Sequence, residues 1–289
     1  RRGLCRHQQP GRQGGTLRLS LRPRPAVTAS ATGSAEGRAA TPAPEPAVLD
    51  VGGFVPFSST DWPGKLAAVV FVQGCPWRCA YCHNTSLQAK RRGDGQAWRE
   101  VVDVLARRVG LLDAVVFSGG EPTLDAGLPA AISSVRAMGF QVGLHTAGLE
   151  PARLKALLPL VDWVGLDVKT SFADYADVTG AARSGKSAKS SLAHVLASGV
   201  AHELRTTYHP ALLSDEALID LARTLKSASA RDWVLQQWQE HEEAADESLA
   251  TQAPAACPRP APLLAATWRW PNAALLDKLR EVGPALSLR

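Results

Sequence analysis

Short apolar runs alternate with longer amphipathic segments along most of the chain, starting near residue 66. The apolar runs read as strands, at residues 66–73, 113–118, 140–145, 162–168, 203–208 and 233–237. Apolar residues at three- and four-residue spacing predict helices at 98–109, 128–138, 151–158, 187–197 and 215–227. Strands that alternate with helices pair in parallel through right-handed crossovers. We therefore expect an α/β fold built as a partial (β/α)6 barrel, with a doubly wound open sheet as the alternative.

Composition separates this repeating part from its flanks. Residues 1–47 are rich in Arg, Pro and Ala and show no helical or strand periodicity, which predicts a disordered N-terminal extension. Residues 48–239 hold the alternating pattern and form the predicted domain. Residues 240–265 are acidic and then rich in Ala and Pro, which indicates a flexible loop. Residues 266–289 contain an amphipathic stretch that predicts a C-terminal helical segment.

The net charge of +5 does not indicate a nucleic-acid partner. Residues 1–50 carry eight arginines against three acidic residues, which accounts for the whole excess, and the rest of the chain is balanced. The apolar run at 66–72 is far shorter than the roughly 18 residues that a membrane span needs. Five cysteines without a secretion signal argue against a disulfide framework. We expect a cytoplasmic protein that binds neither nucleic acid nor a membrane.

Polar and glycine residues follow every predicted strand. In chain order they are Gly74 and Cys75; Gly119, Gly120 and Glu121; His145 and Thr146; Asp167 and Lys169; Arg205, Thr207 and His209; Gln236 and Gln237. The loops that follow the strands of a β/α barrel meet at one face, where such proteins place their working residues. We therefore expect one functional site on this rim.

The stretch GCPWRCAYCHN places Cys75, Cys79 and Cys82 on the loop after the first predicted strand. Thiolates bind zinc, Cu(I) or iron–sulfur clusters. A [4Fe–4S] cube needs a ligand on each of four irons, so three cysteines leave one iron open to bind something else. A zinc site completed by His83 is the alternative, although zinc sites with three cysteines and one histidine usually draw their ligands from two separated pairs.

Three further motifs supply groups at later strand ends. In FSGGEP, the two glycines let the backbone approach a ligand closely, and Glu121 can accept a hydrogen bond from an ammonium group. In GLDVK, Asp167 and Lys169 point the same way and offer an acceptor and a cation, with a surface ion pair as the alternative. In ELRTTYHP, Arg205 suits a carboxylate or a ribose.

The cysteine loop, with Tyr81 before its last cysteine, and the GGEP turn one unit later resemble the radical S-adenosylmethionine (SAM) superfamily. The match runs from about residue 52 to residue 237 and includes DWPGK before the first strand, GLDVK and ELRTTYHP. These motifs are most similar to the longer form of the activating proteins of anaerobic ribonucleoside-triphosphate reductase. Ala147 departs from that pattern, because asparagine is usual there.

The resemblance implies a [4Fe–4S] cluster on Cys75, Cys79 and Cys82 whose open iron binds SAM. It implies SAM contacts from Tyr81, Gly119, Gly120, Glu121, His145, Asp167, Lys169 and Arg205. An electron from a low-potential donor such as flavodoxin or ferredoxin would cleave SAM, and the resulting 5′-deoxyadenosyl radical would take a Cα hydrogen from a glycine of a partner glycyl radical enzyme.

Two alternatives to this activity stay open from the sequence. One is a radical SAM enzyme that acts on a small molecule, like the enzyme that builds a deazaguanine ring. The other is a zinc-stabilised binding module, which would leave the polar groups on the other strand ends without a role.

Overall fold

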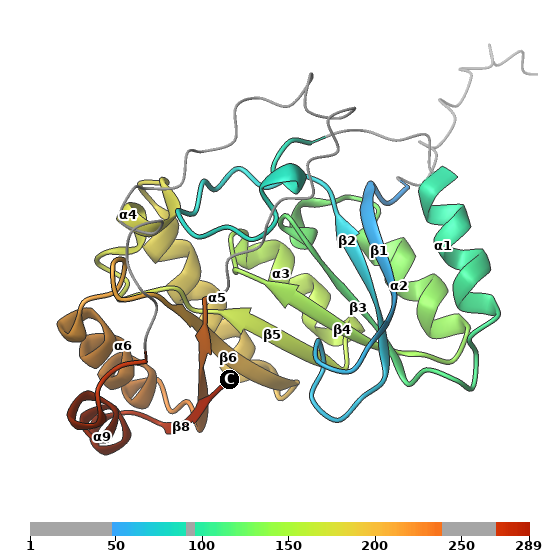
Figure 1. The fold of residues 1–289 in the computed structure, drawn as a ribbon. Helices are drawn as coiled ribbons and strands as arrows, with labels where there is room; N and C mark the ends of the chain where they lie inside the picture. The colour runs from blue at the N-terminus through green and yellow to red at the C-terminus, as the bar shows by residue number, and fades with distance from the viewer. Residues whose placement is uncertain (1–47, 91–95, 239–269) are drawn as a thin grey trace, which may run out of the picture. The chain divides into compact units, whose positions relative to one another are not determined.

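In the part of the chain that the structure describes, eight strands form one mixed sheet, and their order across the sheet is their order along the chain (Figure 1). The strands are β1 (Val51–Ser58), β2 (Ala67–Val72), β3 (Ala114–Gly119), β4 (Gln141–Thr146), β5 (Trp163–Asp167), β6 (Ala201–Tyr208), β7 (Asp232–Gln237) and β8 (Ala285–Leu288). β1 pairs with β2 antiparallel, and each later pair is parallel. This computed structural model describes residues 48–90, 96–238 and 270–289. The predicted extension at 1–47 and the predicted loop at 240–265 lie outside the described residues.

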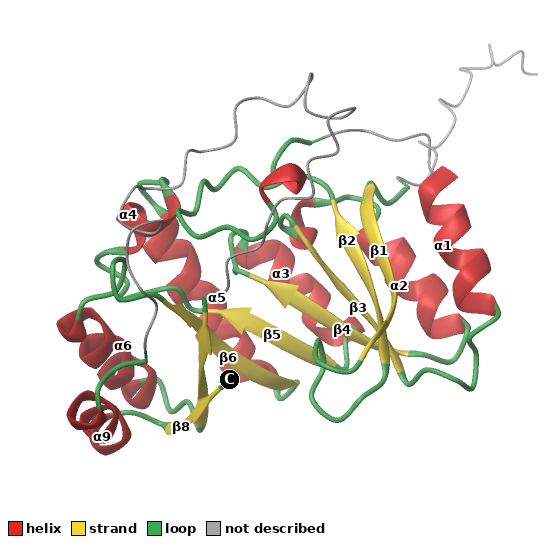
Figure 2. Cartoon of the chain, viewed as in Figure 1, coloured by secondary structure: helices red, strands yellow, loops and turns green. Residues whose placement is uncertain are grey.

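The helices connect successive strands. They are α1 (Gln96–Ala106), α2 (Leu128–Ala137), α3 (Pro151–Leu157), α4 (Tyr175–Thr179), α5 (Ser184–Ser198), α6 (Asp215–Ser227) and α9 (Ala273–Val282), with short 3₁₀ turns η1 (Thr85–Leu87), η2 (Pro122–Leu124) and η3 (Leu158–Leu160). Helices α2, α3 and α5 lie behind the sheet in Figure 2. A doubly wound sheet requires the strand order to reverse, and here it does not. The partial barrel is therefore confirmed and the doubly wound alternative is excluded.

The predicted strands all form, each within two residues of its expected bounds, and the predicted helices form within three residues of theirs. The prediction missed two strands at the edges of the sheet. β1 contains two consecutive glycines and Pro56, which have low strand propensity, and it forms because it pairs with β2. β8 has only four residues and pairs with β7. No helix among the described residues is long and apolar enough to cross a membrane.

The two faces of the sheet are both apolar, as expected for parallel strands buried on each side. On the outer face, Val70, Phe117 and Leu166 pack in the main core beneath the helices. On the inner face, a smaller cluster contains Ala67, Val69, Ala114, Val116, Trp62 and Trp163. The two indole rings of this cluster stack with centroids 5.4 Å apart.

Gly143 makes room for the stacked indoles. A Cβ at this position would lie 2.9 Å from the Trp62 ring, closer than such atoms approach. The DWPGK segment before β2 therefore fills the inner face of the barrel with Trp62, below the rim where the predicted site lies.

Candidate active site

The ends of β2 to β6 and the loops after them line a cavity of about 150 Å³. The predicted site residues that line it are Cys75, Cys79, Cys82, Tyr81, Gly119, Gly120, His145, Asp167, Lys169 and Arg205. The structure thus brings together residues from five strand ends that are up to 130 positions apart in the sequence. Glu121 is the one predicted site residue that is absent from this lining.

Backbone hydrogen bonds join the start of the cysteine loop to the segment that follows the loop. Gly74 N donates to the Leu87 carbonyl at 2.8 Å, and Cys75 N donates to the Gln88 carbonyl at 3.0 Å. Gly74 has a φ of +97°, a conformation that favours glycine, so the chain can turn directly from β2 into the loop. The three thiols are partly buried and form no disulfide.

Burial disfavours the thiolate form of two of the three cysteines. Burial, followed by the Glu121 carboxylate, raises the pKa of Cys75 to about 12, and burial also raises the pKa of Cys79, so metal binding must displace their protons. In a [4Fe–4S] cube each thiolate binds a different iron, so three cysteines on one loop leave one iron open to a further ligand. A single zinc ion would need the same three thiolates and a fourth ligand around one point.

Gly119 and Gly120 bring the end of β3 against the start of the cysteine loop. A Cβ on Gly119 would lie 2.3 Å from Val72 N, and one on Gly120 would lie 2.5 Å from the Gly74 carbonyl oxygen. Gly119 also has a φ of +122°. A side chain on Gly119 would separate β3 from β2, and one on Gly120 would push the end of β3 away from the start of the cysteine loop.

Both oxygens of the Glu121 carboxylate accept hydrogen bonds from protein groups. Its Oε1 accepts from Thr123 N at 3.2 Å and from the hydroxyls of Thr123 and Thr146 at 2.6 and 2.7 Å. Its Oε2 accepts from Ala147 N at 3.0 Å. The side chain is 1% exposed, and this burial raises its pKa against the effect of the hydrogen bonds. Glu121 therefore links the ends of β3 and β4 behind the cavity, and Ala147 contributes its backbone N–H.

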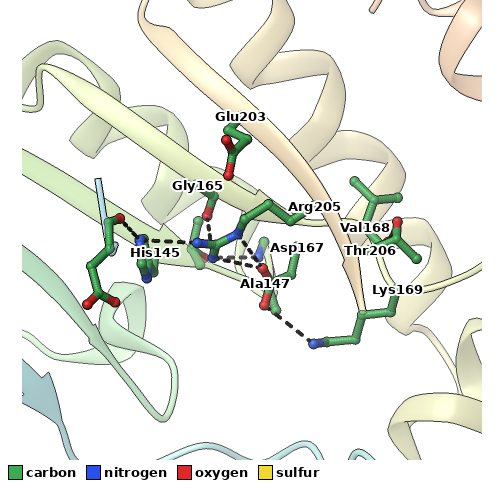
Figure 3. Close-up of polar contacts among 12 residues, drawn as sticks. His145, Ala147, Gly165, Asp167, Val168, Lys169, Glu203, Arg205 and Thr206 are labelled. Atoms are coloured by element: carbon green, nitrogen blue, oxygen red, sulfur yellow. Dashed lines mark hydrogen bonds and ion pairs between the residues drawn. The ribbon is translucent and has the colours of Figure 1, made fainter. Parts of the chain in front are cut away.

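Asp167, Lys169 and Arg205 form a charged group in the cavity (Figure 3). Arg205 donates to Asp167 Oδ1 through Nε and Nη2, at 3.0 and 2.8 Å, and to the Gly165 carbonyl at 3.4 Å. Lys169 Nζ lies 3.7 Å from Asp167 Oδ2 on the other side. Burial alone would raise the pKa of Asp167, but the charges of Arg205 and Lys169 lower it. The two cations and one carboxylate give this group a net charge of +1, which favours an anionic ligand.

His145 joins this group to the inner face of the barrel. Its Nε2 lies 2.7 Å from the Asp61 carbonyl oxygen and 3.1 Å from Arg205 Nη1. The short contact with a carbonyl identifies Nε2 as the protonated donor. Burial, and then the Arg205 charge, lower the pKa of His145 to about 3, so the ring is neutral at physiological pH.

Tyr81 brings the cysteine loop into contact with the charged group. The Lys169 Nζ is 5.3 Å from the centroid of its ring, a cation–π distance. The ring is 5% exposed and packs with Val178 and Trp238. Its hydroxyl has no hydrogen-bond partner among the described residues.

Several lining residues were not predicted as cluster or SAM ligands. They are Trp77, His83, Asn84, Gln88, Ser118, Thr146, Ala147 and Thr207. Thr146 and Thr207 were expected on the rim from their strand-end positions, without an assigned role. The buried Gln88 side chain, whose Nε2 has no partner in the described part of the chain, gives no signal in the sequence. The strand-end residues His209, Gln236 and Gln237 do not line the cavity.

Comparisons with known proteins agree with this geometry. Residues 69–228 match the radical SAM superfamily. A Methanocaldococcus jannaschii protein described as a glycyl-radical enzyme activating enzyme is 32% identical over 209 residues, which cover 69% of this chain and 83% of that protein. The pyruvate formate-lyase-activating enzyme of Clostridium pasteurianum is 33% identical over 131 residues, which cover 43% of this chain and 55% of that enzyme.

A solved structure supports the fold. The structure of Streptococcus suis SuiB bound to S-adenosylmethionine superposes with a TM-score of 0.51 at 11% identity, over 75% of this chain and 48% of SuiB. The match to the superfamily spans more than half of the chain, and the M. jannaschii relative is matched over most of its length. This chain therefore belongs to the radical SAM superfamily and, within it, to the family of glycyl-radical enzyme activating enzymes.

Proposed function

We propose that this protein holds a [4Fe–4S] cluster on Cys75, Cys79 and Cys82 and uses it with SAM to form a glycyl radical in a partner enzyme. The partner we propose is an anaerobic ribonucleoside-triphosphate reductase, because DWPGK, GLDVK and ELRTTYHP resemble the activating proteins of that enzyme. The observation that carries the proposal is the shared cavity. Three thiols from one loop line this cavity. Lys169, whose group with Asp167 and Arg205 carries a net positive charge, and the tightly packed backbone at Gly120 line it as well.

The residues present fit this cofactor pair. The three thiols come from one loop and line one cavity, and three thiolates leave one iron of a cube open for a further ligand. When bound, such a cluster supplies the electron that cleaves SAM to methionine and a 5′-deoxyadenosyl radical, and that radical takes the glycine Cα hydrogen. A low-potential donor such as flavodoxin or ferredoxin must supply the electron.

The chain's own groups bind and orient SAM in this proposal. SAM carries a carboxylate, and Lys169 with Arg205 provides the surplus positive charge that favours it. The backbone of Gly119 and Gly120 lines the cavity and would contact the amino group, and Glu121 joins that turn to the end of β4. Neutral His145 donates to the Asp61 carbonyl and lies beside Arg205 without adding a second positive charge there. Because an exposed cluster needs a reducing, oxygen-poor compartment, we propose the cytoplasm as the location.

The test has two stages, both anaerobic. The protein is reconstituted with iron and sulfide, reduced, and supplied with SAM, with Cys79→Ala as the control. We expect 5′-deoxyadenosine from the wild type and none from the variant. A protein that binds one zinc ion and forms no 5′-deoxyadenosine would contradict the proposal.

The second stage tests the partner. The reduced protein is mixed with an anaerobic ribonucleoside-triphosphate reductase, and electron paramagnetic resonance measures the glycyl radical. A SAM-dependent doublet that is lost when the target glycine is replaced by alanine supports the partner. If SAM is cleaved but no radical forms on this reductase, the proposed partner is wrong, and a small-molecule substrate is favoured.

A further inference from the structure

The Tyr175 hydroxyl contacts the strand end that carries Asp167 and Lys169. It accepts a hydrogen bond from Lys169 N at 2.9 Å and donates one to the Asp167 carbonyl oxygen at 3.3 Å. The side chain is completely buried, and this burial raises the pKa of the phenol, which therefore stays protonated at neutral pH. One hydroxyl thus holds the backbone on both sides of Val168.

The ring of the same residue contacts the cysteine loop. Tyr175 and Trp77 meet edge to face, with ring centroids 6.1 Å apart. Trp77 lies between Cys75 and Cys79 in the sequence, is 5% exposed, and lines the cavity. The indole therefore packs against Tyr175 and belongs to the loop that carries the two cysteines.

The helix that begins at Tyr175 is also bonded to the cysteine loop through its backbone. Arg78 N donates to the Thr179 carbonyl at 2.9 Å, and Ala80 N donates to the Val178 carbonyl at 3.2 Å. The Thr179 hydroxyl donates back to the Tyr175 carbonyl at 2.7 Å, which ties the two ends of α4 together. Helix α4 therefore joins the cysteine loop to the end of β5, two segments about 90 residues apart in the sequence.

We propose that Tyr175 is a positioning residue that sets the distance between the Asp167–Lys169 pair and the cysteine loop, and thereby the affinity of the cavity for SAM. This inference rests on the proposed function, because it assumes that SAM spans the two elements. If the hydroxyl is removed, the buried Lys169 N–H loses its partner, and the strand end is free to shift. A shift of about 1 Å in a positioned group is enough to lower binding and rate.

The variant Tyr175→Phe removes the hydroxyl and keeps the ring against Trp77. We expect normal iron and sulfide content after reconstitution, a dissociation constant for SAM that rises about tenfold, and a matching rise in the KM for 5′-deoxyadenosine formation. Tyr208→Phe is the control, because it makes the same chemical change at a buried tyrosine that does not line the cavity. We expect it to bind SAM like the wild type.

A second measurement does not depend on the loaded enzyme. Amide hydrogen exchange is followed over residues 167–170 before reconstitution, and we expect faster exchange at Lys169 N in Tyr175→Phe but not in Tyr208→Phe. The inference is overturned if Tyr175→Phe keeps wild-type SAM affinity and exchange, or if it loses the cluster together with SAM binding. Failure of the wild type itself to cleave SAM would instead overturn the proposed function, while the exchange result would still test the role of the hydroxyl.

Discussion

Arg205 and Asp167 are joined by two hydrogen bonds to a single carboxylate oxygen. Both Nε and Nη2 of the guanidinium donate to Oδ1, at 3.0 and 2.8 Å, so that Oδ2 faces Lys169. The Arg205 side chain is 9% exposed and the Asp167 side chain is 36% exposed. The pair therefore anchors a partly accessible carboxylate through a buried cation, in contrast to an ordinary surface ion pair.

Replacing Arg205 with lysine should weaken both the fold and the site. Lysine keeps the charge but cannot donate from two nitrogens to Oδ1 or reach the Gly165 carbonyl in the same geometry. We expect a loss of about 1–2 kcal/mol in the free energy of unfolding and a SAM dissociation constant about tenfold higher. Denaturant unfolding and equilibrium binding measure the two effects.

A matched control is available on the surface. Arg136 pairs with Asp162 at 2.8 Å, and their side chains are 46% and 31% exposed. Arg136→Lys should change the free energy of unfolding by less than about 1 kcal/mol and leave SAM binding intact. Equal effects of the two replacements would show that the buried geometry of Arg205 has no special role.

Glu121→Gln should destabilise the protein although the side chains have nearly the same shape. Each Glu121 oxygen accepts from protein donors, and an amide nitrogen in place of either oxygen would face an N–H or O–H group. We expect the free energy of unfolding to fall by about 2 kcal/mol. If Glu121 instead bound the SAM ammonium directly, Glu121→Gln would lower SAM affinity and leave thermal stability unchanged.

Gly120→Ala should be far more damaging than Gly53→Ala. The new Cβ at Gly120 would lie 2.5 Å from the Gly74 carbonyl oxygen, whereas at Gly53 the nearest atom is an ordinary 3.6 Å away. We expect Gly120→Ala to cost about 1–3 kcal/mol of stability and to abolish measurable SAM binding. Gly53→Ala should stay within about 0.5 kcal/mol of the wild type. Similar melting temperatures for both variants would contradict the close approach of β3 to the cysteine loop.

The predictable part of this molecule is the part set by local patterns. Apolar runs and helical spacing locate the strands and helices, and the rule that loops meet at the strand ends places Cys75, His145, Asp167 and Arg205 on one rim. The rule works because parallel strands all end at the same face. The rule does not predict how far each side chain extends into the cavity or which groups the side chain contacts there.

Contacts between distant segments account for what was missed. The strand-end position of Glu121 predicts a SAM contact, but the sequence does not show that its carboxylate also accepts from Thr146, one strand away. Tyr175 lies beyond its strand end and carries no motif, so its link to the cysteine loop is invisible in the sequence. β1 was missed because pairing with β2 outweighs the poor propensity of its glycines and proline.

The pKa of His145 leads to a prediction about acid stability. Folding lowers this pKa from about 6.5 in an unfolded chain to about 3. Between these values the unfolded chain holds a proton that the folded protein lacks, so the free energy of unfolding rises with pH in this window. The contribution is fully present above about pH 6.5 and declines as the pH falls toward 3.

His145→Gln keeps an N–H donor for the Asp61 carbonyl and removes the titration. We compare urea unfolding at pH 7.5 and pH 5.0, and we expect the wild type to lose about 1–2 kcal/mol more than the variant on acidification. His209, whose pKa is also lowered by burial, is present in both proteins and cancels in the difference. Parallel pH dependences would mean that His145 titrates normally, and that neither burial nor the charge of Arg205 keeps its ring neutral beside the cavity.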